Sequence, residues 1–450
     1  MLYIIKSESL EKSLFPHQKK AIDEWFKNEK QGILEMATGT GKTFTAINCL
    51  MKFNKETENL ITVIACPYTH LVSQWKVEIE KYNIARTYEI YGANPNWKRD
   101  LSKLSSRIQR GVIKKAIIFT THKTFSSDFF KSKISMLNTN LFLIADEMHH
   151  MGSERGIQAL LPNYKFRLGL SATPSKYMDD EATEILSKYF GGVIFKFTLT
   201  DALLKRNPIT LKTYLTPYVY LPKKITLTQT EISDYKKLTK TLVSLLNNNY
   251  SEEDKENINS VLRKRRDILN NAEAKYDELR KILRSYEDLD HLIIFCSHKQ
   301  IDKVLEILKE EGVYPRHRFT SKQSSIKLKK FGGISERDKI LMDFDKGFYK
   351  ALVAMKCLDE GVDVPSADKV IIMSSTTNPM EYIQRRGRVL RRCEGKELAH
   401  IYDIMVVPDD EGAYVDTIIE KELERLSEFI KPAKNSDDCI DLLTKWGVLL

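Results

Sequence analysis

The chain has 450 residues, enough for two or three domains with substantial cores. Hydrophobic residues make up 42% of it and charged residues 29%, and no apolar run approaches the roughly 20 residues that span a bilayer, so a disordered or membrane-spanning protein is excluded. The net charge of +10 favours polyanionic partners, and the start lacks a secretory pattern, so we expect a cytoplasmic protein with no membrane partner.

Short apolar runs alternate with helical patterns in the first part of the chain. This alternation is typical of buried parallel strands separated by helices, and it predicts an α/β domain over residues 1–205. The expected strands lie at 61–66, 116–120, 141–145 and 166–170.

A phosphate-binding loop is predicted at Met36–Thr43, before a helical pattern that starts at Phe44. Small residues let backbone N–H groups approach phosphates, and the helix N-terminus adds its positive end. Met36 replaces the usual Gly. We expect the cradle of an ATP molecule at Thr38, Gly39, Thr40 and Gly41, with Lys42 on the β and γ phosphates and the Thr43 hydroxyl on Mg²⁺.

Two segments are unusually basic. Residues 96–115 hold seven basic residues and one acid, and residues 312–335 hold six Lys or Arg and no acid. Either run could bind a polyanion, but a solvated surface also explains each of them.

An acidic pair, Asp146-Glu147, follows the expected strand 141–145 and precedes Met148-His149. The carboxyl ends of strands are where open α/β sheets bind ligands. Asp146 is therefore expected to hold Mg²⁺ and Glu147 to position or deprotonate the attacking water. A solvated turn is the alternative, which the phosphate loop upstream disfavours.

A second α/β domain is expected over residues 206–410. It includes a helical insertion at about 231–289, rich in Lys, Glu, Leu and Asn, and is followed by a helical tail at 411–450. The apolar stripe of the tail, which includes Leu426, Phe429 and Ile430, is expected to pack on its own domain, with docking of a partner as the alternative. The expected strands lie at 292–295, 350–354, 369–373 and 400–404.

Near the end of the second domain lies an arginine run, Gln384 to Arg392. Arg388 and Arg391 are three residues apart, so on a helix both would face the same side. There they could act as arginine fingers on the γ phosphate, which is worth about 10³ to 10⁵ in rate. A basic surface helix is the alternative.

The chain resembles the superfamily 2 helicases of the DExH kind, and the match covers roughly Phe15 to Asp403. The family's motifs occur in order at 15–18, 37–43, 64–75, 120–122, 146–149, 171–173, 294–297, 358–365 and 384–391. The resemblance implies two tandem RecA-like parallel-sheet domains and a nucleic-acid-stimulated ATPase with ATP and Mg²⁺ as cofactors.

Further roles follow only from this resemblance. Gln18 would read the adenine, and Gln384 would sense the γ phosphate. His149, Ser171 and Thr173 would couple hydrolysis to motion, and Gly361 and Asp363 would close on the nucleotide. The nucleic-acid contacts would be Pro67, Thr69, Thr120, Thr121, His122, Ser297 and Lys299.

Met355 stands where RNA-type DEAD proteins carry Thr, and the segment Lys356 to Pro365 is similar to bacterial restriction-type and DNA-repair motors, which favours DNA over RNA. We therefore expect an ATP-dependent DNA helicase or duplex translocase that acts on duplex or branched DNA. It could be the motor subunit of a restriction or phage-defence system. Two alternatives stay open: an RNA helicase, and an ATP-gated DNA clamp that recruits a partner nuclease.

Overall fold

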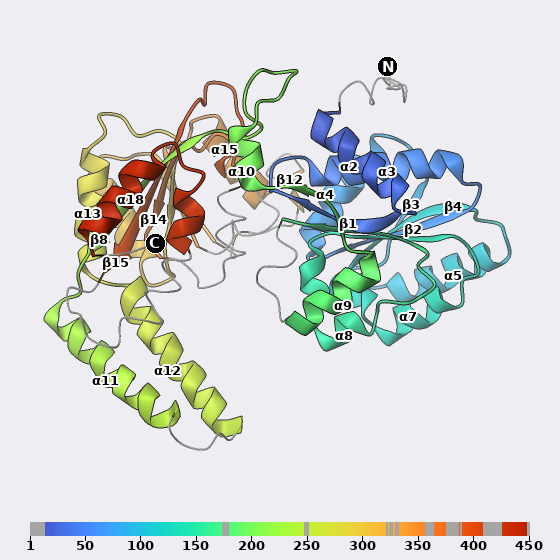
Figure 1. Cartoon of the computed structure of the whole chain (residues 1–450), viewed down its shortest axis with the longest axis horizontal. Helices are drawn as coiled ribbons and strands as arrows, with labels where there is room; N and C mark the ends of the chain where they lie inside the picture. The colour runs from blue at the N-terminus through green and yellow to red at the C-terminus, as the bar shows by residue number, and fades with distance from the viewer. Residues whose placement is uncertain are drawn as a thin grey trace. The chain divides into compact units, whose positions relative to one another are not determined.

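The computed structural model describes residues 14–172, 180–246, 252–320, 323, 327–328, 333–355, 364–374, 387, 389–407 and 425–447. The chain divides into two compact units, Met1–Tyr214 and Leu215–Leu450. The division falls slightly after the boundary expected at 205/206. Helices lie on both faces of each unit's sheet (Figure 1).

Unit 1 is built on a seven-stranded sheet in which every strand pair is parallel, in the order β3-β4-β2-β5-β6-β1-β7. All four strands expected in this part of the chain are present. The strands are β1 (Gln31–Met36), β2 (Leu60–Cys66), β3 (Arg86–Glu89), β4 (Lys115–Thr121), β5 (Leu141–Ala145), β6 (Phe166–Ser171) and β7 (Val193–Phe197). The helices are α2 (Pro16–Lys27), α3 (Lys42–Glu56), α4 (Thr69–Glu80), α5 (Trp97–Gln109), α6 (His122–Phe125), α7 (Asp128–Ser135), the 3-10 turn η1 (Met148–Met151), α8 (Glu154–Ile157), α9 (Asp180–Phe190) and α10 (Leu199–Leu204).

The core of unit 1 explains why its strands read as continuous apolar runs. Every residue of β2 and of β5 is buried, as expected for central strands that have helices on both faces. On one face Trp25 of α2 and Phe53 of α3 pack on Phe142. On the other face Leu101 of α5 and Phe190 of α9 join one buried cluster with alternate strand residues.

Unit 2 has a six-stranded sheet, again with every strand pair parallel, in the order β10-β13-β9-β14-β15-β8. The four strands expected from the sequence are β9, β13, β14 and β15. The elements are β8 (Tyr218–Ile225), α11 (Gln229–Leu246), α12 (Glu252–Asn270), α13 (Ala274–Arg284), β9 (Leu292–Phe295), α14 (Ile301–Glu310), β10 (Arg316–Phe319), β11 (Lys327–Leu328), β12 (Ile334–Ser335), α15 (Glu336–Asp345), β13 (Ala351–Ala354), β14 (Lys369–Ile372), β15 (Ala399–Val406) and α18 (Ser436–Lys445).

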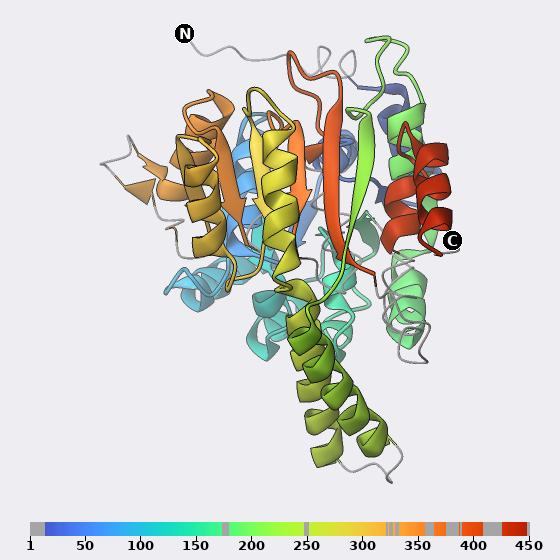
Figure 2. The ribbon, with the colours of Figure 1, turned by 90° about the vertical axis from the view of Figure 1, so that its left-hand side faces the viewer.

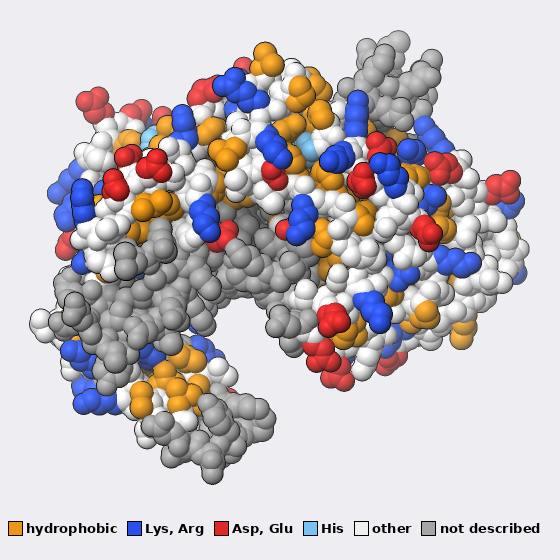
Figure 3. Space-filling model, in the orientation of Figure 1, with side chains coloured by type: hydrophobic (Ala, Val, Ile, Leu, Met, Phe, Trp, Pro, Cys, Tyr) orange, Lys and Arg blue, Asp and Glu red, His pale blue; other side chains and the backbone are white. Residues whose placement is uncertain are grey.

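The expected helical insertion is a hairpin of α11 and α12 that extends beyond the sheet of unit 2 (Figure 2). Hydrophobic side chains gather on part of this hairpin (Figure 3), and the exposed hydrophobic residues of α11 and α12 include Val243, Leu246 and Leu262. The insertion is shorter than the expected 231–289, because α13 belongs to the sheet layer. The apolar face of α13, including Leu279 and Ile282, is buried in the core of unit 2.

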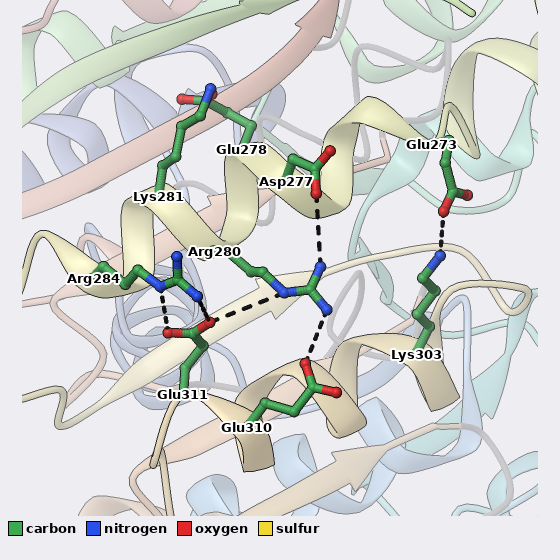
Figure 4. Close-up of polar contacts among 9 residues, drawn as sticks. All are labelled: Glu273, Asp277, Glu278, Arg280, Lys281, Arg284, Lys303, Glu310 and Glu311. Carbon is green, nitrogen blue, oxygen red and sulfur yellow. Dashed lines mark hydrogen bonds and ion pairs between the residues drawn. The ribbon is translucent and has the colours of Figure 1, made fainter.

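Ion pairs fix α13 to α14 (Figure 4). Arg284 makes two bonds to the Glu311 carboxylate, at 2.8 and 2.7 Å, and Arg280 Nη2 donates to Glu310 at 2.9 Å. Lys303 of α14 pairs with Glu273, directly before α13. These contacts hold the end of the hairpin close to the residues that precede α14.

The C-terminal segment packs on unit 2, as expected. Leu426, Phe429 and Ile430 are buried, and the side-chain amide of Asn435 pairs with both the N–H and the carbonyl of Tyr220, at 2.9 Å each. Because β8 is an edge strand, Asn435 takes the place of a neighbouring strand there. The rest of the predicted stripe lies outside the described residues.

Candidate nucleotide and nucleic-acid sites

The predicted phosphate loop joins the C-terminal end of β1 to the first turn of α3. Gly39 and Gly41 both have the left-handed backbone that favours glycine, with φ of 86° and 89°. A Cβ atom at Gly41 would collide with Nε2 of Gln18. The loop therefore needs glycine here for its backbone, and a side chain at this position would also force Gln18 to shift.

Helix α2 braces this loop through two buried side chains. Gln18 Nε2 donates to the carbonyl of Thr40 at 3.1 Å, and Nε2 of His17 lies 3.0 Å from the same oxygen. The side-chain carbonyl of Gln18 accepts from the N–H of Phe15 at 3.0 Å. Gln18 thus positions the loop, and one N–H and one lone pair of its side-chain amide remain for the predicted contact with adenine.

Lys42 begins α3 and turns back towards the end of β1. Its buried Nζ donates to the carbonyl of Met36 at 3.1 Å and lies 3.6 Å from Oε1 of Glu147. The lysine of the phosphate loop and the second residue of the acidic pair are therefore neighbours, as their predicted roles require.

Asp146 is the first residue after β5, and its N–H donates to the carbonyl of Ala65 in β2 at 2.9 Å. Its carboxylate accepts from the indole N–H of Trp75 at 2.8 Å. Burial, followed by the charge of Glu147, raises the pKa of Asp146 to about 6, although the Trp75 hydrogen bond and Lys42 oppose this shift. Burial and the nearby negative charge thus destabilise the ionised form of Asp146, and a cation beside the carboxylate would stabilise that form.

Two of the three predicted coupling residues lie in contact. His149 Nδ1 is 3.2 Å from Oγ of Ser171 at the end of β6, and 3.7 Å from Oε2 of Glu147. Burial lowers the pKa of His149 to about 4, so its ring is neutral at physiological pH. His149 thus connects the acidic pair to the end of β6. Thr173 lies outside the described residues.

The loop and the acidic pair fit a magnesium nucleotide. The Thr38 hydroxyl is buried with no hydrogen-bond partner in the described part of the chain, and so offers a donor to a phosphate. Thr43 lies in the first turn of α3, where N–H groups and the helix dipole favour an anion. Thr43 and Asp146 carry the oxygen ligands that Mg²⁺ prefers.

The nucleic-acid contacts predicted for unit 1 differ in exposure. Thr69 is exposed and Pro67 is partly exposed, just after β2, with exposed Tyr68 between them. Thr120, Thr121 and His122 are buried. Thr121 caps α6 by accepting from Thr124 N, and Nε2 of His122 lies 3.3 Å from the carbonyl of Ala65.

In unit 2, the predicted contacts Ser297 and Lys299 are held by the end of α12. Ser297 Oγ donates to Asn271 Oδ1 at 2.5 Å, and Lys299 Nζ pairs with Asp267 at 2.9 Å. The buried amide of Gln300 links the two segments, because it donates to the carbonyl of Asn270 and accepts from the N–H of Ser297, at 2.9 Å each.

The arginine run is only partly described. Gln384, Arg388, Gly361 and Asp363 lie outside the described residues. Gly387 and Val389 are helical, but Arg391 lies in a bend beyond the helix end. The expectation that one helical face carries both arginines is therefore wrong for Arg391.

Lys396 accounts for this geometry. Its buried ammonium donates to the carbonyls of Val389, Arg391 (3.5 Å) and Pro365 (3.0 Å). Burial lowers the pKa of Lys396 to about 8. The Lys396 side chain thus binds both the helix end and the segment after residue 363. No pattern in the sequence indicated this role for Lys396.

Family models match both units. Residues 11–176 match the model described as "Type III restriction enzyme, res subunit", and residues 274–393 match "Helicase conserved C-terminal domain". Together these ranges cover more than half of the chain.

One curated relative matches across both units. The "DNA 3'-5' translocase XPB2" of Sulfurisphaera tokodaii is 28% identical over 400 residues, which are 85% of this chain and 79% of that protein. Two solved structures share the fold at 16% identity. The "ATP-dependent Type ISP restriction-modification enzyme LlaBIII bound to DNA" has a TM-score of 0.63, and the match covers 96% of this chain and 30% of that one. The Pyrococcus furiosus Hef helicase domain has a TM-score of 0.56, and the match covers 93% of this chain and all of that domain.

These matches confirm the prediction of two tandem RecA-like domains. Among the helices of the described ranges, none has the length and apolar character to cross a bilayer. The chain belongs to the superfamily 2 helicases, ATP-hydrolysing enzymes that act on nucleic acid.

Proposed function

We propose that this protein is a magnesium-dependent ATPase that moves on duplex or branched DNA as a helicase or translocase. The main support is the contact between Lys42, the acidic pair and the phosphate loop in unit 1. DNA is favoured over RNA because a relative that matches across both units is named a DNA translocase. A cytoplasmic location stays a prediction.

The hydrolytic roles follow from the side chains at the loop. Lys42 exchanges the carbonyl of Met36 and the carboxylate of Glu147 for the β and γ phosphates. That exchange frees Glu147 to orient the attacking water and accept its proton. Thr43 and Asp146 would hold Mg²⁺, which would neutralise phosphate charge there.

Coupling to movement is assigned to His149, Ser171 and Thr173. His149 lies between Glu147 and Ser171. A movement of the Glu147 carboxylate can therefore move the His149 ring, and with it Ser171 at the end of β6. In unit 2, Gly361, Asp363, Gln384, Arg388 and Arg391 are proposed to close on the nucleotide. Alternate grips through Pro67, Thr69, Ser297 and Lys299 then become steps along a strand, whereas the buried Thr120, Thr121 and His122 support the first of these segments from within unit 1.

The deciding experiment measures ATPase rates with duplex DNA, single-stranded DNA and RNA, with Lys42→Ala as the inactive control. We expect the strongest stimulation from DNA and none in Lys42→Ala. Stimulation by RNA alone would overturn the choice of DNA, and full turnover in Lys42→Ala would overturn the site.

A triplex-displacement assay separates a motor from an ATP-gated clamp. A translocase displaces the third strand only when ATP is hydrolysed. DNA-stimulated hydrolysis without displacement would instead support the clamp.

A role as the motor of a restriction or phage-defence system is also proposed. It is favoured by the match of residues 11–176 to the restriction-subunit model and by the structural match to only 30% of a restriction-modification enzyme. In such a system a separate nuclease would cut the DNA. Purification from its source as a fully active protein with no associated nuclease would argue against this role.

A further inference from the structure

Helix α5 of unit 1 carries a row of positive side chains that the proposed ATPase cycle does not use. Its apolar face, with Leu101, Leu104 and Ile108, is buried in the core cluster of unit 1. The opposite face carries exposed basic residues at spacings of four, four and three. Such spacing aligns them along one side of a helix. We call these residues the α5 stripe: Arg99, Lys103, Arg107 and Arg110.

The charges of the α5 stripe are poorly compensated. Its one acidic neighbour on the helix is Asp100, which lies 3.7 Å from Arg99 and 3.4 Å from the amide of Asn94. Within the described ranges, no carboxylate lies within ion-pair distance of Lys103, Arg107 or Arg110. Like charges four residues apart destabilise a helix, so an anionic partner would relieve a cost present in the free protein.

Two other basic side chains, Arg265 and Lys299, differ from the α5 stripe because they have partners within unit 2. Arg265 on α12 is buried and stacks on Tyr235, to whose hydroxyl it donates at 2.7 Å. Lys299, close to the end of that helix, is paired with Asp267. These side chains already have partners within unit 2, whereas most of the α5 stripe has none of opposite charge.

The segment that precedes α5 lies beside Thr121, one of the predicted nucleic-acid contacts of unit 1. The N–H of Gly92 donates to Thr124 Oγ1 at 3.1 Å, and that hydroxyl also accepts from Thr121. Trp97, the first residue of α5, packs edge-on against Phe129. From Arg99 the α5 stripe runs about 16 Å along the helix, at 1.5 Å per residue.

We propose that the α5 stripe binds the phosphate backbone of duplex DNA next to the segment gripped by the motor. The inference rests on the proposed function. A straight row of Lys and Arg suits phosphates, which bind without base recognition. It has no exposed aromatic side chains interleaved for base stacking, and this favours a duplex over an unpaired strand.

The test compares two variants that each lose three positive charges. The stripe variant carries Arg99→Gln, Lys103→Gln and Arg107→Gln. The control carries Lys55→Gln, Lys165→Gln and Lys188→Gln, all exposed residues of unit 1 outside the stripe. Binding of a duplex several helical turns long, and of one of its single strands, is measured over a range of salt concentrations, together with basal and stimulated ATPase rates.

We expect the stripe variant to bind the duplex more weakly, with the slope of log affinity against log salt reduced by about 3, because each lost phosphate contact removes about 0.9. Basal ATPase should match the wild type, and the control should keep the wild-type slope. Equal slopes for the two variants would overturn the inference and leave the proposed function intact. A wild-type ATPase that no nucleic acid stimulates would instead overturn the proposed function. A loss confined to the single strand would refute the assignment to duplex DNA.

Discussion

The Nζ atom of Lys42 lies 3.6 Å from Oε1 of Glu147, although Lys42 begins the helix after β1 and Glu147 follows β5. Oε2 of the same carboxylate lies 3.7 Å from His149. In the proposed cycle the lysine leaves Glu147 for the phosphates, so the carboxylate becomes available to water only when nucleotide is bound. The ion pair between Lys42 and Glu147 therefore makes the general base, Glu147, available only after nucleotide binds.

Glu147→Gln is expected to separate ATP binding from hydrolysis. The amide keeps the size of the side chain but cannot accept a proton, so DNA-stimulated turnover should fall by about 10² to 10⁴. ATP affinity, measured with a fluorescent analogue, should change little. Glu154→Gln on the nearby α8 serves as the control, and a Glu147→Gln enzyme as fast as that control would remove Glu147 from the proposed role.

Gly41→Ala is expected to weaken ATP binding strongly, because the added Cβ atom meets Gln18 Nε2 and displaces its bond to Thr40. Gly111→Ala is a matched control: its φ of 71° is also left-handed, but nothing lies within 4 Å of the added atom. Both variants carry backbone strain of about 1 to 2 kcal/mol, so a loss of ATP affinity in Gly41→Ala alone reports a change at the phosphate loop and not a general loss of stability. Similar affinities in the two variants would contradict it.

The strands could be predicted from the sequence because their apolar runs are local. Residues 141–145 form a continuous apolar run and are all buried in β5. The motif order then placed the phosphate loop and the acidic pair at carboxyl ends of strands in one sheet. The end of the helical insertion could not be predicted as well. Helix α13 has the same kind of helical pattern as the hairpin, and only the packing of its apolar face on the core of unit 2 separates it from the insertion.

The partners of the site residues could not be predicted, because they depend on contacts between distant segments. Trp75 reaches Asp146 across 71 positions, and Lys396 reaches Pro365 across 31. The burial of Thr120, Thr121 and His122 was missed for the same reason. Small polar side chains suggested phosphate contacts, but the cap of α6 and the contact with Ala65 involve Thr121 and His122.

Lys396→Met is expected to loosen the bend that carries Arg391 while keeping most of the side-chain volume. Loss of hydrogen bonds from a charged donor costs about 1.5 to 3 kcal/mol each when carbonyls are left unpaired. We expect stimulated kcat to fall by about tenfold or more, which corresponds to about 1.4 kcal/mol in the barrier. The KM for ATP should stay near wild type. Lys281→Met, at an exposed ion pair, is the control; equal kcat values in the two variants would show that Lys396 does not position Arg391.

The raised pKa of Asp146 predicts a pH dependence for magnesium. Burial and the charge of Glu147 raise this pKa from 3.8 to about 6. The folded protein therefore favours the protonated Asp146, and the stability that this group contributes in full below pH 3.8 is lost as the pH rises through 6. The fraction of Asp146 that is ionised, the form that binds a cation, falls below one half under pH 6. We expect the Mg²⁺ concentration for half-maximal ATPase activity to rise as pH falls from about 7.5 to 5.5.

Trp75→Phe tests the cause of this dependence. It removes the hydrogen bond that favours the ionised Asp146, so the midpoint of the magnesium dependence should move to higher pH. Trp97→Phe, away from the acidic pair, is the control. An unchanged midpoint in Trp75→Phe would mean that another group sets the pH dependence.

Gln300→Ala is expected to disconnect the α12 end from the predicted grip at Ser297 and Lys299. The change leaves the carbonyl of Asn270 and the N–H of Ser297 without the buried amide that now binds both, at a cost of about 1 to 3 kcal/mol for each group. Because these groups lie in unit 2 and the phosphate loop in unit 1, basal ATPase should be kept while the DNA concentration needed for stimulation rises severalfold. Gln109→Ala removes an exposed amide that donates to Met136, and should leave both quantities unchanged. A Gln300→Ala enzyme that loses basal and stimulated ATPase in equal measure would indicate general destabilisation, and one with wild-type DNA dependence would separate Gln300 from the grip.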